Sequence, residues 1–118
     1  MFGVWRLLCW SGVTVLFNHC DDDIDFYIES PIFPGDGRKR IFTLKAQTPK
    51  LIDKRRLDPF RESDVDTTVT LVSRLSGCGD LTRTPNYFSG FCVIKFRVSG
   101  NQLESYGEIR RRRFTERF

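Results

Sequence analysis

The sequence contains almost no alanine, since Ala46 is the only one among 118 residues. Alanine is the residue that forms helices most readily, so an ordinary helical domain uses it often. Its scarcity, beside 11 Phe and many Val, Ile and Thr, therefore favours strands. The length allows one hydrophobic core, which at this size needs neither a metal nor a disulfide to be stable.

The sequence patterns of common nucleotide-binding and hydrolase sites are also absent. There is no GxxxxGK[ST], GxGxxG, HExxH or GxSxG, and His19 is the single histidine. A thiol nucleophile at Cys78, which lies in a polar loop, would need His19 as its base, and nothing in the spacing brings the two together. We therefore expect a protein that is not an enzyme and that carries no cofactor.

Metal-ligand spacing is missing as well. The four cysteines form no CxxC pair, and a zinc site usually needs two close pairs of ligands. The carboxylates between Asp21 and Asp25 lack the glycine and the glutamate that a calcium-binding loop requires, so we read them as a charged turn. We expect no metal and reduced core cysteines, Cys92 above all, with two disulfides as the alternative for a secreted chain. The cysteines are Cys9, Cys20, Cys78 and Cys92.

The longest uncharged run covers only residues 7–20 and is too short to span a membrane. It ends without the small residues of a signal-peptide cleavage site. We read it as part of the core, with an uncleaved interfacial segment as the alternative. The chain is expected in the cytoplasm or the nucleus, without association with a membrane.

Strands are predicted where apolar and polar residues alternate. This alternation is clearest over residues 24–29, 41–46, 65–71 and 92–98, and turn residues follow at 34–37 and 99–101. Ser11 and Gly12 predict a first hairpin between residues 4–10 and 13–17. We expect a mainly β fold, as a small antiparallel sheet, a sandwich or a partly open barrel.

Helical signals are fewer. Thr48 followed by Pro49 resembles a helix N-terminus, and Asp58 before Pro59 is a natural stop, so a short helix is predicted over residues 49–57. Residues 103–109 fit either a strand or a helix, which leaves an α+β fold with a C-terminal helix as the alternative. The simplest organisation is one compact strand-rich domain over residues 1–109 and a basic tail over residues 110–118.

Positive charge is concentrated in short blocks. Arginine outnumbers lysine by 14 to 5, and the net charge is +4. Guanidinium groups bind phosphate through two parallel hydrogen bonds, which lysine does not do. The blocks would form one face for a polyanion if the fold brought them together. They consist of Arg38, Lys39, Arg40, Lys54, Arg55, Arg56, Arg110, Arg111, Arg112 and Arg113.

These blocks lead to two functional hypotheses. The first is a small accessory or regulatory protein that binds nucleic acid, RNA more readily than DNA, through the phosphate backbone. The second is a protein-interaction module whose basic face meets an acidic partner, with the arginine run over residues 110–113 acting as a nuclear-import signal. An enzyme is the least supported class.

Overall fold

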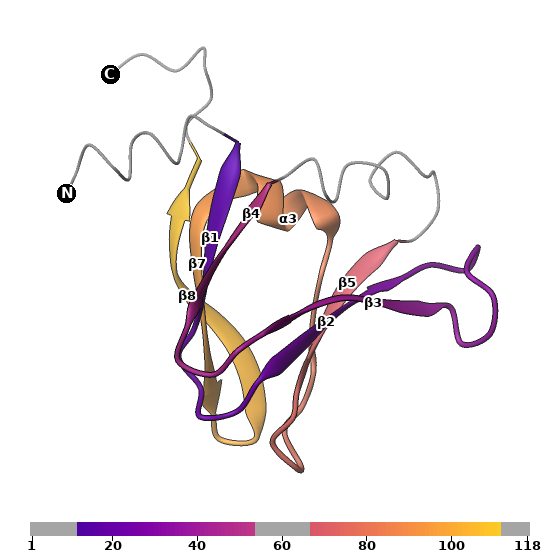
Figure 1. Cartoon of the computed structure of the whole chain (residues 1–118), viewed down its shortest axis with the longest axis horizontal. Helices are drawn as coiled ribbons and strands as arrows, with labels where there is room; N and C mark the ends of the chain where they lie inside the picture. Colours follow the sequence, from indigo (N-terminus) through magenta and orange to yellow (C-terminus); the bar gives the residue numbers. More distant parts are fainter. Residues whose placement is uncertain (1–11, 54–66, 112–118) are drawn as a thin grey trace.

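The computed structural model describes residues 12–53 and 67–111, which form two four-stranded sheets and one short helix (Figure 1). This confirms the prediction of a mainly β fold. The elements are β1 (Val13–Asn18), β2 (Ile24–Glu29), β3 (Arg38–Leu44), β4 (Pro49–Asp53), β5 (Thr68–Ser73), β6 (Leu81–Arg83), α3 (Pro85–Gly90), β7 (Phe91–Ser99) and β8 (Gln102–Arg110).

One sheet has the strand order β4-β1-β7-β8 and the other β3-β2-β5-β6. Neighbouring strands are antiparallel except for β1 and β7, which run parallel. The chain passes from the first sheet to the second after β1 and returns after β3. In the described residues the chain crosses between the sheets from β1 to β2, from β3 to β4 and, through α3, from β6 to β7.

Aromatic side chains fill the space between the sheets. Phe26 of β2 is 1% exposed and stacks on Phe42 of β3, with ring centroids 4.4 Å apart. It meets Phe96 of β7 edge-on at 5.8 Å and Phe88 of α3 at 6.1 Å. Residues from both sheets and from the helix thus share one core, in which burial of apolar surface is the main stabilising contribution.

The helix predicted over residues 49–57 is wrong for its described part, because Pro49–Asp53 form strand β4. These residues pair antiparallel with β1, and their side chains alternate, with Ile52 3% exposed beside Leu51 at 60%. Pairing with β1 therefore outweighs the local helix signal at Pro49. Residues 54–57 lie outside the described residues.

Three further segments resolve what the sequence left open. Residues 103–109 belong to strand β8, so the C-terminal helix is excluded. The loop expected over residues 76–86 contains β6 and leads into helix α3, which was not predicted. Strand β1 is confirmed, but β4 and β7 lie on its two sides, and residues 4–10 of the predicted hairpin fall outside the described part.

Each sheet edge carries a feature that discourages pairing with another strand. Strand β4 begins with a proline, β6 has three residues, and β8 is offset from β7 by two register shifts. Strand β3 exposes three consecutive basic side chains and is offset from β2 by one register shift. Proline, short length, irregular pairing and charge all weaken an edge as a template for a further strand.

Candidate interaction surface

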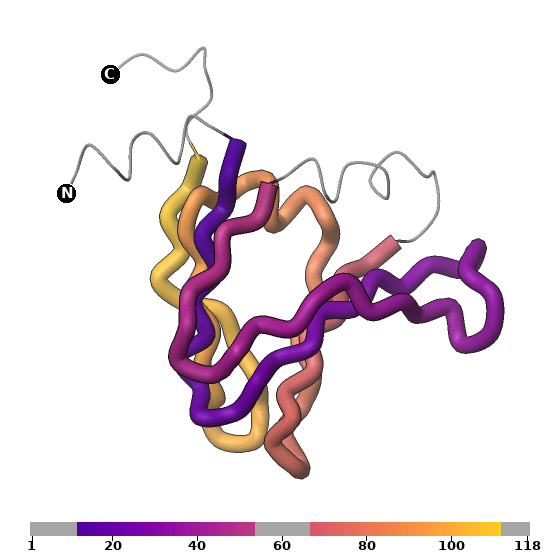
Figure 2. The backbone as a smooth tube through the Cα atoms, in the orientation of Figure 1, coloured from indigo at the N-terminus to yellow at the C-terminus, as the bar shows by residue number. Residues whose placement is uncertain are grey.

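The hairpin of β2 and β3 projects to one side of the sandwich, at the right of Figure 1 and, as a backbone tube, of Figure 2. Its loop over residues 30–37 has a defined conformation. The Ser30 amide donates to the Gly37 carbonyl at 2.8 Å, and the Phe33 amide donates to the Ser30 carbonyl at 3.1 Å. Gly37 has a φ of +72°, and a Cβ there would come within 3.0 Å of the Ser30 carbonyl oxygen. The loop thus depends on glycine at this position.

Basic side chains cover the exposed edge of this hairpin. The guanidinium of Arg38 lies 2.7 Å from Glu29 Oε1 and 4.8 Å from the ring centroid of Tyr27. Lys39 and Arg40 are exposed and form no ion pair within residues 12–53 and 67–111. The hairpin therefore presents two cations without an ion pair in the described segments, one on each face: Lys39 lies opposite Ile28 and Arg40 opposite Tyr27. Arg40 also helps to lower the pKa of Asp25.

The loop adds apolar and acidic groups to the exposed part of the hairpin. Ile32 is 63% exposed, whereas Phe33 beside it packs against the core. Asp36 accepts the Arg38 amide at 3.0 Å. We call this set of groups the hairpin surface: Tyr27, Glu29, Ile32, Asp36, Arg38, Lys39 and Arg40. The cations of this surface were predicted from the sequence, whereas Ile32 was not, and the turn residues around Ile32 were the available signal.

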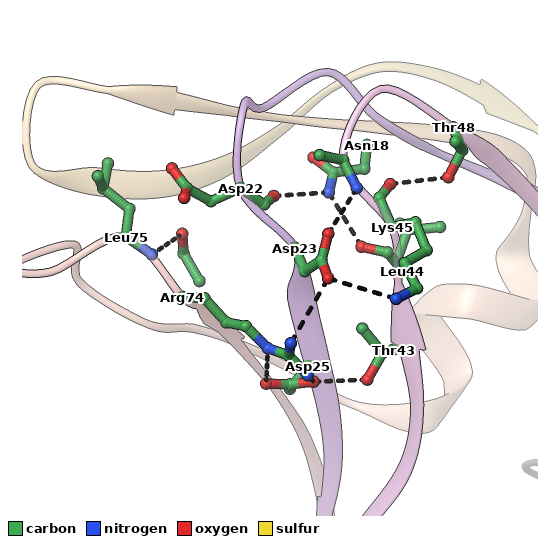
Figure 3. A network of polar contacts seen from close by, with 12 residues as sticks. Asn18, Asp22, Asp23, Asp25, Thr43, Leu44, Lys45, Thr48, Arg74 and Leu75 are labelled. Atoms are coloured by element: carbon green, nitrogen blue, oxygen red, sulfur yellow. Dashed lines mark hydrogen bonds and ion pairs between the residues drawn. The ribbon is translucent and has the colours of Figure 1, made fainter.

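A network of polar contacts holds the opposite end of this hairpin (Figure 3). Arg74 donates to both carboxylate oxygens of Asp25, at 2.9 and 3.0 Å, and the Thr43 hydroxyl donates to Asp25 Oδ1 at 2.6 Å. Asp23 accepts the Ala46 amide at 2.9 Å and lies 3.8 Å from Lys45 Nζ. The acidic run is thus a charged turn joined to β3 and to the end of β5.

The Asp25 carboxylate gives folding a pH dependence of known sign. The hydrogen bond from Arg74 is the main cause that lowers the pKa of Asp25; burial opposes it and the bond from Thr43 assists. The pKa of aspartate in an unfolded chain is about 3.9. As the pH falls, the unfolded chain therefore protonates this carboxylate at a higher pH than the folded chain does. We expect Asp25 to make its full contribution to the free energy of unfolding above the pKa of the unfolded state. This contribution is lost as the pH falls through the lower pKa of the folded state.

The measurement is urea unfolding from about pH 6 to pH 2 for the wild-type chain and for Asp25→Asn. The stability of the variant should decrease less at acid pH than that of the wild type. If its decline matches that of the wild type, other carboxylates cause it.

The arginines at the end of β8 have two different environments. Arg110, the last residue of the strand, is exposed. The Arg111 guanidinium instead donates to the carbonyls of Val13 at 2.7 Å and Ser89 at 3.1 Å, and to Thr14 Oγ1 at 3.0 Å. Burial lowers the pKa of Arg111. This guanidinium is occupied by internal acceptors.

The fold separates the two described basic blocks. The hairpin surface lies at the right of Figure 1 and the end of β8 at the upper left. The described residues carry eleven basic and ten acidic side chains, so this part of the chain is close to neutral. A single basic face made of both blocks is therefore not formed by the described residues. Lys54, Arg55, Arg56, Arg112 and Arg113 lie outside them.

The groups considered for catalysis are engaged elsewhere. His19 is hydrogen-bonded through Nδ1 to the hydroxyl of Tyr106, and its ring meets Phe17 edge-on. The Arg97 guanidinium lies over the Tyr106 ring, 4.4 Å from the ring centroid. No three His, Cys, Asp or Glu side chains in the two described segments are grouped to hold a metal ion. His19 thus belongs to an exposed aromatic cluster on the outer face of its sheet.

The cysteines correct one expectation. Cys92 is fully buried, as predicted, but it is disulfide-bonded, to a partner outside the described residues, so the expectation of a reduced thiol is wrong. Cys20 and Cys78 are free thiols. The apolar strand position of Cys92 is equally suitable for a buried thiol and for a buried disulfide, so the sequence pattern alone does not separate the two.

Comparison with known proteins gives no family: no family model, no curated protein and no solved structure matches the chain. None of the described helices is long and apolar enough to cross a membrane.

Proposed function

We propose that the chain is a non-enzymatic binding protein that docks on an acidic protein surface through the hairpin surface. The observation that carries this proposal is the placement of Lys39 and Arg40, exposed and without an ion pair among the described residues, on a projecting, well-defined hairpin. A preordered element loses little conformational entropy on binding, and charge complementarity speeds and orients association.

The composition of the hairpin surface favours a protein over a nucleic acid. Glu29 pairs with Arg38 and Asp36 accepts its amide, so the surface carries charges of both signs, whereas nucleic-acid interfaces carry a large excess of cations. Tyr27 stacked under Arg38 and the exposed Ile32 provide an aromatic group, a guanidinium and an apolar group, which are typical of the centre of protein interfaces. The charged sheet edges also disfavour docking by strand addition, so side chains would make the contacts.

The experiment must distinguish binding to an acidic protein from the alternative, which is binding to RNA through its phosphates. The probes are a fluorescent poly-glutamate peptide and a single-stranded RNA of equal charge, with anisotropy measured at about 50 and 200 mM salt. We expect the peptide to bind, and the double variant Lys39→Glu/Arg40→Glu to weaken this binding about tenfold because two attractions become repulsions. Arg110→Glu, at the other end of the molecule, is the matched control and should bind as the wild type does.

A second readout locates the contact on the surface. A photo-crosslinking residue at position 32 should label the bound peptide, whereas the same residue at position 51, which is equally exposed on β4, should not. RNA binding with a steep salt dependence, together with no binding of the peptide, would replace this proposal by the nucleic-acid hypothesis. Equal labelling from both positions would show that the hairpin is not the binding site.

A further inference from the structure

Two free thiols lie at the end of the sandwich where three turns meet, at the bottom of Figure 1. Cys20 is in the turn between β1 and β2, and Cys78 is in the loop between β5 and β6. Both side chains contact the same core cluster, and Cys20 is 6% exposed. Neither thiol takes part in the function proposed above.

Backbone contacts hold both cysteines against the hairpin of β7 and β8. The Cys20 thiol lies 3.9 Å from the Phe96 carbonyl oxygen, and the His19 amide donates to that same oxygen at 2.9 Å. On the other side, the Gly79 amide donates to the Asn101 carbonyl at 2.6 Å, and the Gly79 carbonyl accepts the Leu103 amide at 3.1 Å. Leu103 pairs with Val98, two residues after Phe96, so the two cysteines are fixed to neighbouring parts of one hairpin.

A glycine beside Cys78 permits this placement. Gly77 has a φ of +80°, which L side chains rarely adopt. A Cβ at Gly79 would lie 2.3 Å from Gln102 Oε1, and the amide group of Gln102 donates to the Asp80 carbonyl at 2.6 Å. That atom is the end of a flexible side chain and can move, so glycine is required by the backbone conformation at position 77 and not by the close approach at position 79. Gly77 thus lets the loop turn back onto the β7-β8 hairpin, which Cys20 also contacts.

We propose that Cys20 and Cys78 form a second disulfide bond when the chain meets a small-molecule disulfide such as oxidised glutathione. The disulfide at Cys92 supports this, because protein disulfides form and persist in oxidising compartments. The bond would link the turn that leaves one sheet to a loop of the other. It would therefore fasten the two sheets together at this end.

The exchange proceeds in two balanced steps. Cys78, the more accessible thiol, loses its proton, attacks one sulfur of the small disulfide and releases one small thiol. Cys20 then loses its proton, attacks the Cys78 sulfur of this mixed disulfide and releases the second small thiol. Burial, and to a lesser extent the neighbouring Cys78, raises the pKa of Cys20, so Cys20 is the poorer nucleophile for the first step. Its attack on the mixed disulfide is intramolecular, which offsets its small thiolate fraction.

The test uses the full chain, equilibrated in glutathione buffers, quenched with acid, alkylated, digested and analysed by mass spectrometry. We expect a peptide pair linked through Cys20 and Cys78, with neither thiol alkylated, in buffers where Cys92 is still bonded. Closing so long a loop should raise the Tm by about 10 °C relative to Cys78→Ser in the same oxidising buffer. In reducing buffer the two chains should agree to within about 3 °C.

The variant is made at position 78 because a serine hydroxyl at the buried position 20 would itself destabilise the core. A second variant, Gly77→Ala, keeps both thiols but disfavours the φ of +80° that the loop needs, and should lower the equilibrium constant for bridge formation about tenfold. Both thiols alkylated under oxidising conditions would overturn the proposal. So would a bond from either thiol to a second chain or to Cys92.

Discussion

Replacing Arg111 with alanine is expected to lower the free energy of unfolding by about 3 kcal/mol, as measured by urea unfolding. The Arg111 guanidinium donates to the carbonyls of Val13, Ser89 and Phe91, and these belong to β1, α3 and β7. Alanine would leave these carbonyls without this donor in a place that water reaches poorly. Hydrogen bonds from charged groups contribute more than neutral ones, which is why the expected loss is large for one half-buried residue.

Arg110→Ala is the matched control, because Arg110 is the same residue type one position earlier and is exposed. Its unfolding free energy should change by less than about 0.5 kcal/mol. Equal effects of the two substitutions would contradict the structural role of Arg111. The pair also separates stability from binding, since an arginine occupied by internal acceptors is expected to add nothing to affinity for an anionic partner.

Strands were predictable where one face of the strand is buried. Ile24, Phe26 and Ile28 all point into the core from β2, so the period of two is visible in the sequence itself. The ambiguity over residues 103–109 has a physical cause. Gly107, with a φ of +58°, lies where β8 is offset from β7, and this offset interrupts the alternation that would have indicated a strand.

One local signal led to two different structures. Thr48-Pro49 and Thr84-Pro85 both resemble a helix N-terminus, yet only the second begins a helix. In α3 the turn after the proline directs Phe88 into the core, where it is 1% exposed. After Pro49 the partner is β1, more than thirty residues earlier in the chain, and local propensity contains no information about such a partner.

Part of the hairpin surface was predictable from the sequence. Consecutive basic residues between a predicted turn and a predicted strand indicate exposure, and Arg38, Lys39 and Arg40 are exposed. The sequence could not distinguish Arg110 from Arg111, because the acceptors of Arg111 are mostly backbone carbonyls distant in the chain, which leave no mark in the residue pattern. Nor could it show that the fold separates the end of β8 from the hairpin surface, because that distance is a property of the topology.

Replacing Asn18 with alanine should lower the free energy of unfolding by about 3 kcal/mol. The Asn18 side chain has no exposed surface and satisfies three backbone groups of the turns that follow β1 and β3. Its amide donates to the carbonyls of Asp22 at 2.9 Å and Leu44 at 3.0 Å, and its Oδ1 accepts the Cys20 amide at 2.8 Å (Figure 3). Alanine would leave the Leu44 carbonyl and the Cys20 amide, whose bonds to Asn18 are buried, without these partners.

Gln47→Ala is the control for this prediction, because Gln47 also supports the turn after β1 with a side-chain amide but is exposed. It donates to the Cys20 carbonyl at 3.0 Å, where water can take its place. Its φ of 55° is unfavourable for glutamine and alanine alike, so this strain cancels in the comparison. We expect a loss below about 1 kcal/mol. If the two variants lost equal stability, burial would not be the reason for the effect at Asn18.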